Sequence, residues 1–205
     1  TGMDEPLGSQ VGNALEVKEA IDTLAGRSRG PLLEVSLALG AQMLLLGGVA
    51  QDGESALRML ETALKEGKGL ERLRLMIRAQ GGDERVCDDT GLLPQAEAAT
   101  PVLSPKSGYL ARMDAEQAGL AAQVLGAGRL TKEDVIDPAA GYILYRRVGD
   151  YFREGEPFAE LRHAKKAPHM EAARMLRDSL RFSDDPPQIP QLIRARIAPD
   201  GKETQ

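Results

Sequence analysis

The sequence is poor in cysteine, has no excess of positive charge and contains no long uninterrupted apolar run. Cys87 is the only cysteine among 205 residues, so the chain can form neither an intramolecular disulfide nor a metal site built from several cysteines. This cysteine usage fits a reducing compartment, and we expect a cytoplasmic protein. Lys and Arg number 26 against 31 Asp and Glu, and the formal net charge of -5 argues against nucleic acid as a partner.

Residues 32–49 form the most apolar stretch of the sequence, but Glu34, Ser36 and Gln42 interrupt it. A membrane span needs about 20 mostly apolar residues, so the stretch predicts a buried core helix and no membrane partner. The sequence also has no initiating Met and no charged leader followed by an apolar run and a cleavage site. We therefore expect the chain to be a segment of a longer protein.

The first 82 residues are typical of amphipathic helices. Ala14, Val17 and Ile21 recur at helical spacing on one side of the first segment, and Asp52 is a candidate N-cap for the third. The predicted helices span residues 13–25, 31–46, 53–66 and 70–79. Because no strong strand in this region gives the helices a partner, we expect them to cover a sheet formed by upstream sequence.

The composition changes near Leu93, where three prolines follow within a dozen residues, and we place a domain boundary there. Short β-like runs alternate with turn signals beyond it, which predicts an α+β domain. Thr131 and Asp134 resemble a capping box and predict a brief helical turn. The predicted strands span residues 108–113, 141–147, 157–163 and 191–197, and the predicted helices span residues 115–126 and 170–182.

A specific resemblance begins at the N-terminus. Residues 3–8 read Met-Asp-Glu-Pro-Leu-Gly, and residues 11–20 read Val-Gly-Asn-Ala-Leu-Glu-Val-Lys-Glu-Ala. Together they resemble the M-x-x-P-L-G-x-x-V-G-N-A-L-E-V-x-E-A stretch of the thymidine and pyrimidine-nucleoside phosphorylases. Further matches follow in the family's order, among them residues 80–83, 125–129 and 148–150, and the likeness covers about residues 1–197.

The resemblance implies a fold that is α/β and α+β. Residues 1–93 would be the helical layer of a mixed α/β domain, and residues 94–205 a C-terminal α+β domain like a barrel-sandwich. Spaced glycines after Gly108 also look like biotinyl and lipoyl carrier domains at the level of the fold. A carrier needs a modifiable Lys at a hairpin tip, and the corresponding hairpin has none.

The resemblance also implies an activity, that of a pentosyltransferase. Pyrimidine-nucleoside phosphorylases convert a pyrimidine nucleoside and inorganic phosphate reversibly into the free base and (deoxy)ribose 1-phosphate, and they are typically homodimers. The family's phosphate loop, base-binding residues and Gly-rich signature all lie upstream of Thr1. We therefore assign no catalytic residue to this chain, expect it to be inactive alone, and expect the N-terminal half of the same protein as its partner.

A monovalent cation site, potassium-like, is implied by the resemblance as well. Leu7 and Gln10 would contribute backbone carbonyls and Glu19 a carboxylate, and the remaining carbonyls would come from the upstream phosphate loop. Oxygen-only ligation suits a hard cation. No organic cofactor is expected.

Other polar groups have simpler interpretations. The acidic group of Asp83, Glu84, Asp88 and Asp89 lacks the spacing of a calcium loop, and turn-forming or capping aspartates are favoured over a divalent cation site. His163 and His169 flank two lysines, where a solvated turn before a helix is favoured over an anion patch. Glycines 126 and 128 are typical of a helix end and tight turn rather than a phosphate loop, and Cys87 is expected to be inert.

A function from a different class stays open beside the enzyme. The chain would then be a non-catalytic scaffold or interaction module that retains the family's C-terminal fold. An upstream reading frame encoding the Gly-rich signature would refute that alternative.

Overall fold

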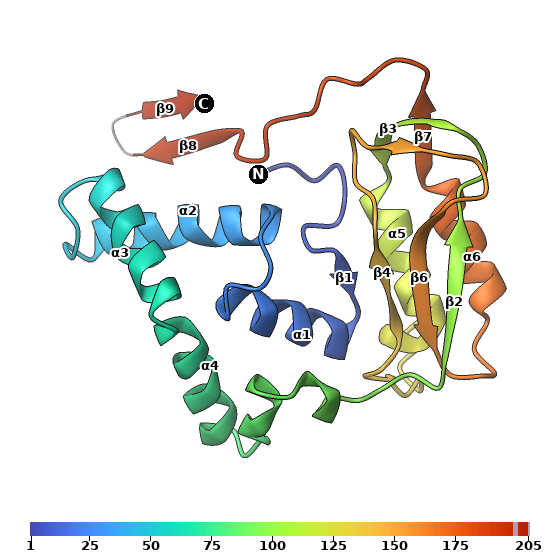
Figure 1. Cartoon of the computed structure of the whole chain (residues 1–205), viewed down its shortest axis with the longest axis horizontal. Coiled ribbons are helices and arrows are strands. Elements are labelled where there is room, and N and C mark those ends of the chain that lie inside the picture. The colour runs from blue at the N-terminus through green and yellow to red at the C-terminus, as the bar shows by residue number, and fades with distance from the viewer. Residues whose placement is uncertain (199–200, 205) are drawn as a thin grey trace. The chain divides into compact units, whose positions relative to one another are not determined.

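The computed structural model in Figure 1 describes residues 1–198 and 201–204 of the chain. The chain divides into two compact units, and each is treated by itself. A helical unit comprises Val17–Leu93, and a sandwich unit comprises Thr1–Glu16 together with Pro94–Gln205. The assignment of residues 1–93 and 94–205 to two domains of a known family stays a prediction.

Four α-helices and two short 3₁₀ helices make up the described part of the helical unit, although the first turn of α1 falls in the sandwich unit. Pro31 starts its helix at the predicted first-turn position. Asp52 caps the third helix, because its carboxylate accepts a hydrogen bond from the Ser55 amide at 2.7 Å. The predicted helices are thus confirmed as α1 (Asn13–Leu24), α2 (Pro31–Leu46), α3 (Gly53–Lys65) and α4 (Lys68–Ala79), followed by η1 (Glu84–Cys87) and η2 (Thr90–Leu92).

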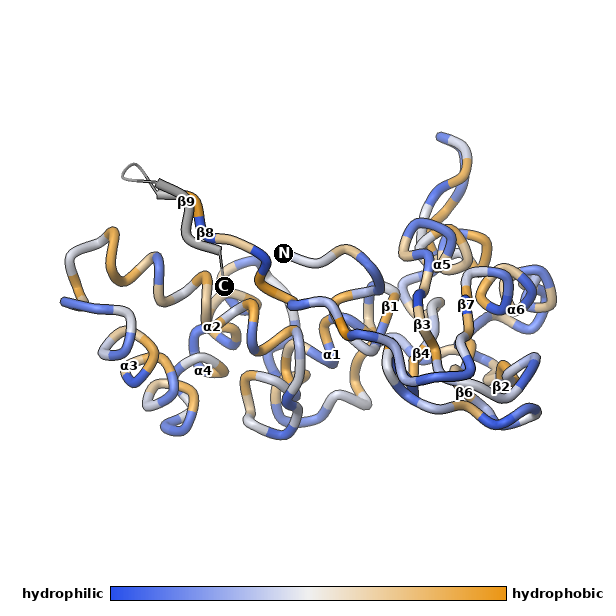
Figure 2. Tube along the Cα trace, turned by 90° about the horizontal axis from the view of Figure 1, so that it is seen from above, coloured by the Kyte–Doolittle hydropathy of each residue, from blue (hydrophilic) through white to orange (hydrophobic). Residues whose placement is uncertain are grey.

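The helical unit buries few large side chains. Ile21, Val86 and Cys87 form a small core onto which partly buried residues of α4 pack. The predicted apolar helix is α2, and hydrophobic residues recur along it (Figure 2). Only Val35 and Ala41 of α2 are buried, whereas Met43 is 70% and Leu46 89% exposed. The prediction of a buried core helix is therefore wrong for most of α2 within the described residues.

Two antiparallel sheets and a hairpin build the sandwich unit. The strand order is β1-β4-β6-β2 in the first sheet and β5-β3-β7 in the second, and β8 pairs with β9. The first-sheet strands are β1 (Gln10–Val11), β4 (Gly141–Leu144), β6 (Pro157–His163) and β2 (Ala98–Leu103); the second-sheet strands are β5 (Tyr151–Phe152), β3 (Gly108–Met113) and β7 (Leu180–Ser183); the hairpin pairs β8 (Ala195–Ala198) with β9 (Gly201–Thr204). The predicted α+β class is confirmed, and the sheets do not close into a barrel.

The core of the sandwich unit is large and aromatic. Tyr142, Phe152 and Phe158 are fully buried, and the Tyr142 hydroxyl donates to the Ala118 carbonyl at 2.9 Å. Burial raises the pKa of the Tyr142 phenol. Small residues let two helices, α5 (Ala115–Ala122) and α6 (His169–Asp178), pack together against this core (Figure 1).

Several boundaries differ from those predicted. The helix expected over residues 170–182 ends at Asp178, because Leu180 and Phe182 alternate toward the core in β7. The helix expected over residues 115–126 continues from α5 into η3 (Gln123–Ala127), where Gly126 turns the backbone at a φ of 107°. This confirms the predicted helix end.

Two further elements differ. The strand predicted over residues 191–197 begins only at Ala195. No helix forms at Thr131. The Asp134 carboxylate instead accepts from the Leu130 and Thr131 amides and the Thr131 hydroxyl, so Asp134 closes a turn.

Within the described residues, no helix is both long enough and apolar enough to cross a membrane.

Candidate functional site

The turn that follows β4 presents an arginine to the N-terminal segment. The Arg147 amide donates to the Asp150 carboxylate at 2.8 Å, and the Asp150 amide donates back to the Arg147 carbonyl at 3.0 Å. Gly149 lies between them at a φ of 98°, a backbone conformation that favours glycine. The turn therefore has a fixed geometry, and its first residue directs a guanidinium toward residues 5–7.

We call the resulting contacts the Arg147 clamp, formed by Arg147, Val148, Glu5, Pro6 and Leu7. The Arg147 Nε donates to Glu5 Oε1 at 3.2 Å, and the Val148 amide donates to Glu5 Oε2 at 3.0 Å. The two Nη atoms donate to the Leu7 carbonyl at 2.9 and 3.2 Å, and Nη2 also donates to the Pro6 carbonyl. The Arg147 and Glu5 side chains are each only 22% exposed. These hydrogen bonds fix the direction of two consecutive carbonyls.

The residues predicted to hold a monovalent cation are distributed over both units. Leu7 belongs to the clamp, and Gln10 lies in β1 opposite Ile143. Glu19 lies in α1 within the helical unit, and it is 7% exposed rather than solvated on a polar helix face. The cation site therefore stays a prediction, whose Leu7 carbonyl already accepts hydrogen bonds from a guanidinium.

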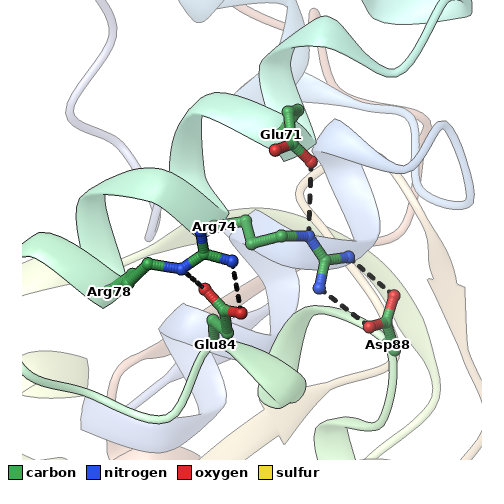
Figure 3. A network of polar contacts seen from close by, with 5 residues as sticks. All are labelled: Glu71, Arg74, Arg78, Glu84 and Asp88. Carbon is green, nitrogen blue, oxygen red and sulfur yellow. Dashed lines mark hydrogen bonds and ion pairs between the residues drawn. The ribbon is translucent and has the colours of Figure 1, made fainter.

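The acidic group at the end of α4 forms ion pairs with arginines (Figure 3). Arg74 binds Asp88 through two hydrogen bonds of 2.7 and 2.8 Å, and Arg78 binds Glu84. These hydrogen bonds from the arginines lower the pKa of both carboxyls. The α4–η1 connection is thus held by charge pairs at its surface.

The two other acids of this group support the predicted capping role. Asp83 accepts from the Arg85 amide at 3.1 Å, and Asp89 accepts from the Gly91 amide at 2.9 Å. The Arg85 side chain, and then its amide, lower the pKa of Asp83 to about 2. Among the described residues, no group of three or more His, Cys, Asp or Glu side chains is arranged to hold a metal ion.

The two histidines stack, with ring centroids 4.6 Å apart and planes inclined by 12°. His163 ends β6 and is buried, where Nε2 lies 2.9 Å from the Thr100 hydroxyl and Nδ1 lies 2.8 Å from the Ala164 carbonyl. The predicted solvated turn is therefore wrong for His163, since β6 carries its ring into the sheet, but right for Lys165 and Lys166, which are exposed.

Cys87 and a cavity of the helical unit offer little chemistry. Cys87 is buried, and desolvation raises the pKa of its thiol, as the inert interpretation requires. The cavity, about 340 Å³, opens between α1, α2, α3 and α4 and is lined mainly by leucines, with Thr23 and Ser36 as its polar side chains. Such a lining lacks the charged donors that a phosphate site needs.

Sequence reasoning missed Glu5 and Arg147 as partners. Glu5 falls in residues 3–8, a string that carries the resemblance, and Arg147 directly precedes another such string, residues 148–150. Their separation of 142 positions gives no periodic signal. The pairing of β1 with β4 brings the two segments together.

Comparison with known proteins gives a consistent result. Residues 109–183 match the family model described as the pyrimidine nucleoside phosphorylase C-terminal domain. The pyrimidine-nucleoside phosphorylase of Geobacillus stearothermophilus is 40% identical over 196 residues, covering 96% of this chain and 45% of that protein. Its namesake from Bacillus subtilis (strain 168) is 41% identical over 195 residues, again covering 95% of this chain and 45% of the relative. The chain thus spans less than half the length of these curated relatives.

Proposed function

Because the chain belongs to the pyrimidine-nucleoside phosphorylase family, we propose that it is the C-terminal part of an enzyme that catalyses reversible phosphorolysis of pyrimidine nucleosides. The products are the free base and (deoxy)ribose 1-phosphate. The observation that supports this most is the 40% identity over 96% of the chain, which includes both the helical and the sandwich unit.

The reaction displaces a pyrimidine at an anomeric carbon and needs converging cationic or hydrogen-bonding groups. One set must hold the phosphate, and another must stabilise the departing base. In the described residues, the arginines of the α4–η1 network pair with carboxylates instead, and the cavity of the helical unit is apolar. These observations support the proposal that the chain completes the fold and provides packing surface, and that the reacting groups lie in the rest of the enzyme.

The partners follow from the same proposal. The exposed apolar side chains of α2 are a surface suited to the N-terminal half of the enzyme, which would supply the phosphate and base sites. Pyrimidine nucleoside and inorganic phosphate are then the substrates of the intact protein, and the assembled enzyme is a homodimer in the cytoplasm.

Phosphate-dependent release of thymine from thymidine and of uracil from uridine tests the proposal. The chain alone is compared with the chain mixed with its N-terminal half. Activity that needs both parts supports the proposal, whereas activity of the chain alone would show that reacting groups lie within it. Binding of the N-terminal half without any phosphorolysis would favour the scaffold alternative. The ratio of thymine to uracil released also gives the substrate preference.

A further inference from the structure

The Leu7 carbonyl has no acceptor capacity left for a further ligand. A backbone carbonyl oxygen has two lone pairs, and the Leu7 oxygen accepts from both Nη1 and Nη2 of Arg147. The neighbouring Pro6 carbonyl accepts from Nη2 as well. A metal ion at Leu7 would therefore have to displace a hydrogen bond or share its oxygen with the guanidinium.

The charges around the Leu7 carbonyl also disfavour a bound cation. The Arg147 guanidinium is permanently protonated, and the Glu5 carboxylate beside it supplies the compensating negative charge. A potassium ion at the same oxygen would lie close to this guanidinium, and like charges at that separation repel. The residues present at Leu7 thus do not fit a potassium ion.

The clamp is also anchored on both sides, so the guanidinium is not a loosely placed surface group. Val148 binds the second Glu5 oxygen through its amide. Upstream of the clamp, the Gly2 amide donates to the Leu192 carbonyl at 2.7 Å, and Asp4 pairs with Arg194. The N-terminal segment is therefore fixed to the sandwich unit at several points along its length.

We propose that the guanidinium of Arg147 is the internal cation of residues 5–7, and that the Leu7 carbonyl is consequently not a potassium ligand in this protein. The inference does not depend on the proposed enzymatic function, because it concerns how this segment is held. The cation site implied by the family resemblance uses the Leu7 carbonyl oxygen as a ligand, and in this protein that oxygen binds Arg147 instead.

Thermal unfolding of the chain, both alone and mixed with the N-terminal half that would supply the remaining carbonyls, tests the proposal without any activity assay. Midpoints are measured in potassium, sodium and N-methylglucamine chlorides at equal ionic strength. The unmodified chain is expected to show the same midpoint in all three salts. A saturable rise of the midpoint that is specific for potassium would overturn the proposal.

Variants of Arg147 provide the second arm. Arg147→Gln removes the charge, and we expect the midpoint to fall by roughly 3–8 °C in N-methylglucamine chloride, with partial recovery in potassium chloride. Arg147→Lys keeps the charge and should lose less without becoming sensitive to potassium. Arg153→Gln, at an exposed arginine outside the clamp, is the matched control and should change nothing.

Two outcomes of this arm contradict the proposal. One is an Arg147→Gln midpoint that responds to potassium no more than that of the unmodified chain. The other is a potassium-specific stabilisation of Glu5→Gln, which retains the guanidinium and serves as the test if Arg147→Gln does not fold.

Discussion

The sandwich unit and the helical unit achieve very different degrees of burial. All three phenylalanines and all four tyrosines of the chain lie in the sandwich unit, where Tyr142, Phe152 and Phe158 are fully enclosed. The helical unit has no aromatic residue, and its longest helix leaves Met43 and Leu46 exposed. The sandwich unit therefore has a complete core of its own, whereas the helical unit has apolar surface that a further partner would cover.

The largest expected effect is the loss of an aromatic side chain from the sandwich core. Phe158 packs edge to face on Phe152 with ring centroids 5.7 Å apart. Phe158→Ala should lower the free energy of unfolding by about 3–5 kcal/mol, because it leaves a cavity among side chains that cannot fully collapse. Denaturant titration followed by tyrosine fluorescence measures this change.

Met43→Ala is the matched control in α2. Because Met43 is largely exposed, the free energy of unfolding of this variant should differ from that of the unmodified chain by less than about 0.5 kcal/mol. Equal losses in the two variants would contradict the contrast between the units.

Association of the isolated chain is the next expected effect. With Leu39, Met43 and Leu46 exposed on α2, the chain should self-associate and bind a hydrophobic dye. The double variant Met43→Lys with Leu46→Lys should shift sedimentation toward monomer and reduce dye fluorescence. A clean monomer without dye binding in the unmodified chain would show that the α2 surface needs no partner.

Local sequence signals predicted several elements correctly. The bounds of α2, β3 and β6 agree with the structure to the residue, because each has a helix-start or turn signal at its ends. β2 was missed because Pro101 indicates a break. The strand lies at the edge of its sheet, where a proline costs no ladder hydrogen bond. β7 was missed because Leu180 and Phe182 also fit the preceding helical period.

Contacts between residues far apart in the sequence could not be predicted from local sequence patterns. Residues 1–16 join the sandwich unit because the two-residue strand β1 pairs with β4, about 130 positions later. The Arg147 clamp depends on that same pairing, so its partners could not be inferred from spacing. In the α4–η1 network, the capping aspartates were predictable from local turn chemistry, whereas the pairing of Arg74 with Asp88 was not.

The helix caps test, with a smaller expected effect, whether the two units unfold separately. Asp114 caps α5 by accepting from the Gln117 amide at 3.1 Å, and Asp52 caps α3 in the helical unit. Asp114→Ala should lower the free energy of unfolding of the sandwich unit by about 1 kcal/mol. If the two units unfold separately, hydrogen exchange will show faster opening near α5 in this variant and near α3 in Asp52→Ala. Faster opening in both units from either substitution would indicate one cooperative structure.

The smallest expected effect concerns Asp83, whose contacts lie entirely within the helical unit. The Arg85 side chain and amide lower the pKa of Asp83 from 3.8 to about 2, so the folded chain binds fewer protons than the unfolded chain between these values. The resulting stabilisation is present above pH 4 and is lost as the pH falls toward 2. Asp83→Asn retains an acceptor for the Arg85 amide but removes the charge, and should flatten the pH dependence of unfolding in that window.

Salt separates this charge effect from the cap itself. Because Asp83 and Arg85 are both exposed, added salt should reduce the difference between the unmodified chain and Asp83→Asn. Unfolding midpoints between pH 2 and 5, measured at low and high salt, give the comparison. A difference that persists at high salt and stays constant between pH 2 and 5 would mean that the side chain acts through backbone geometry and not through its charge.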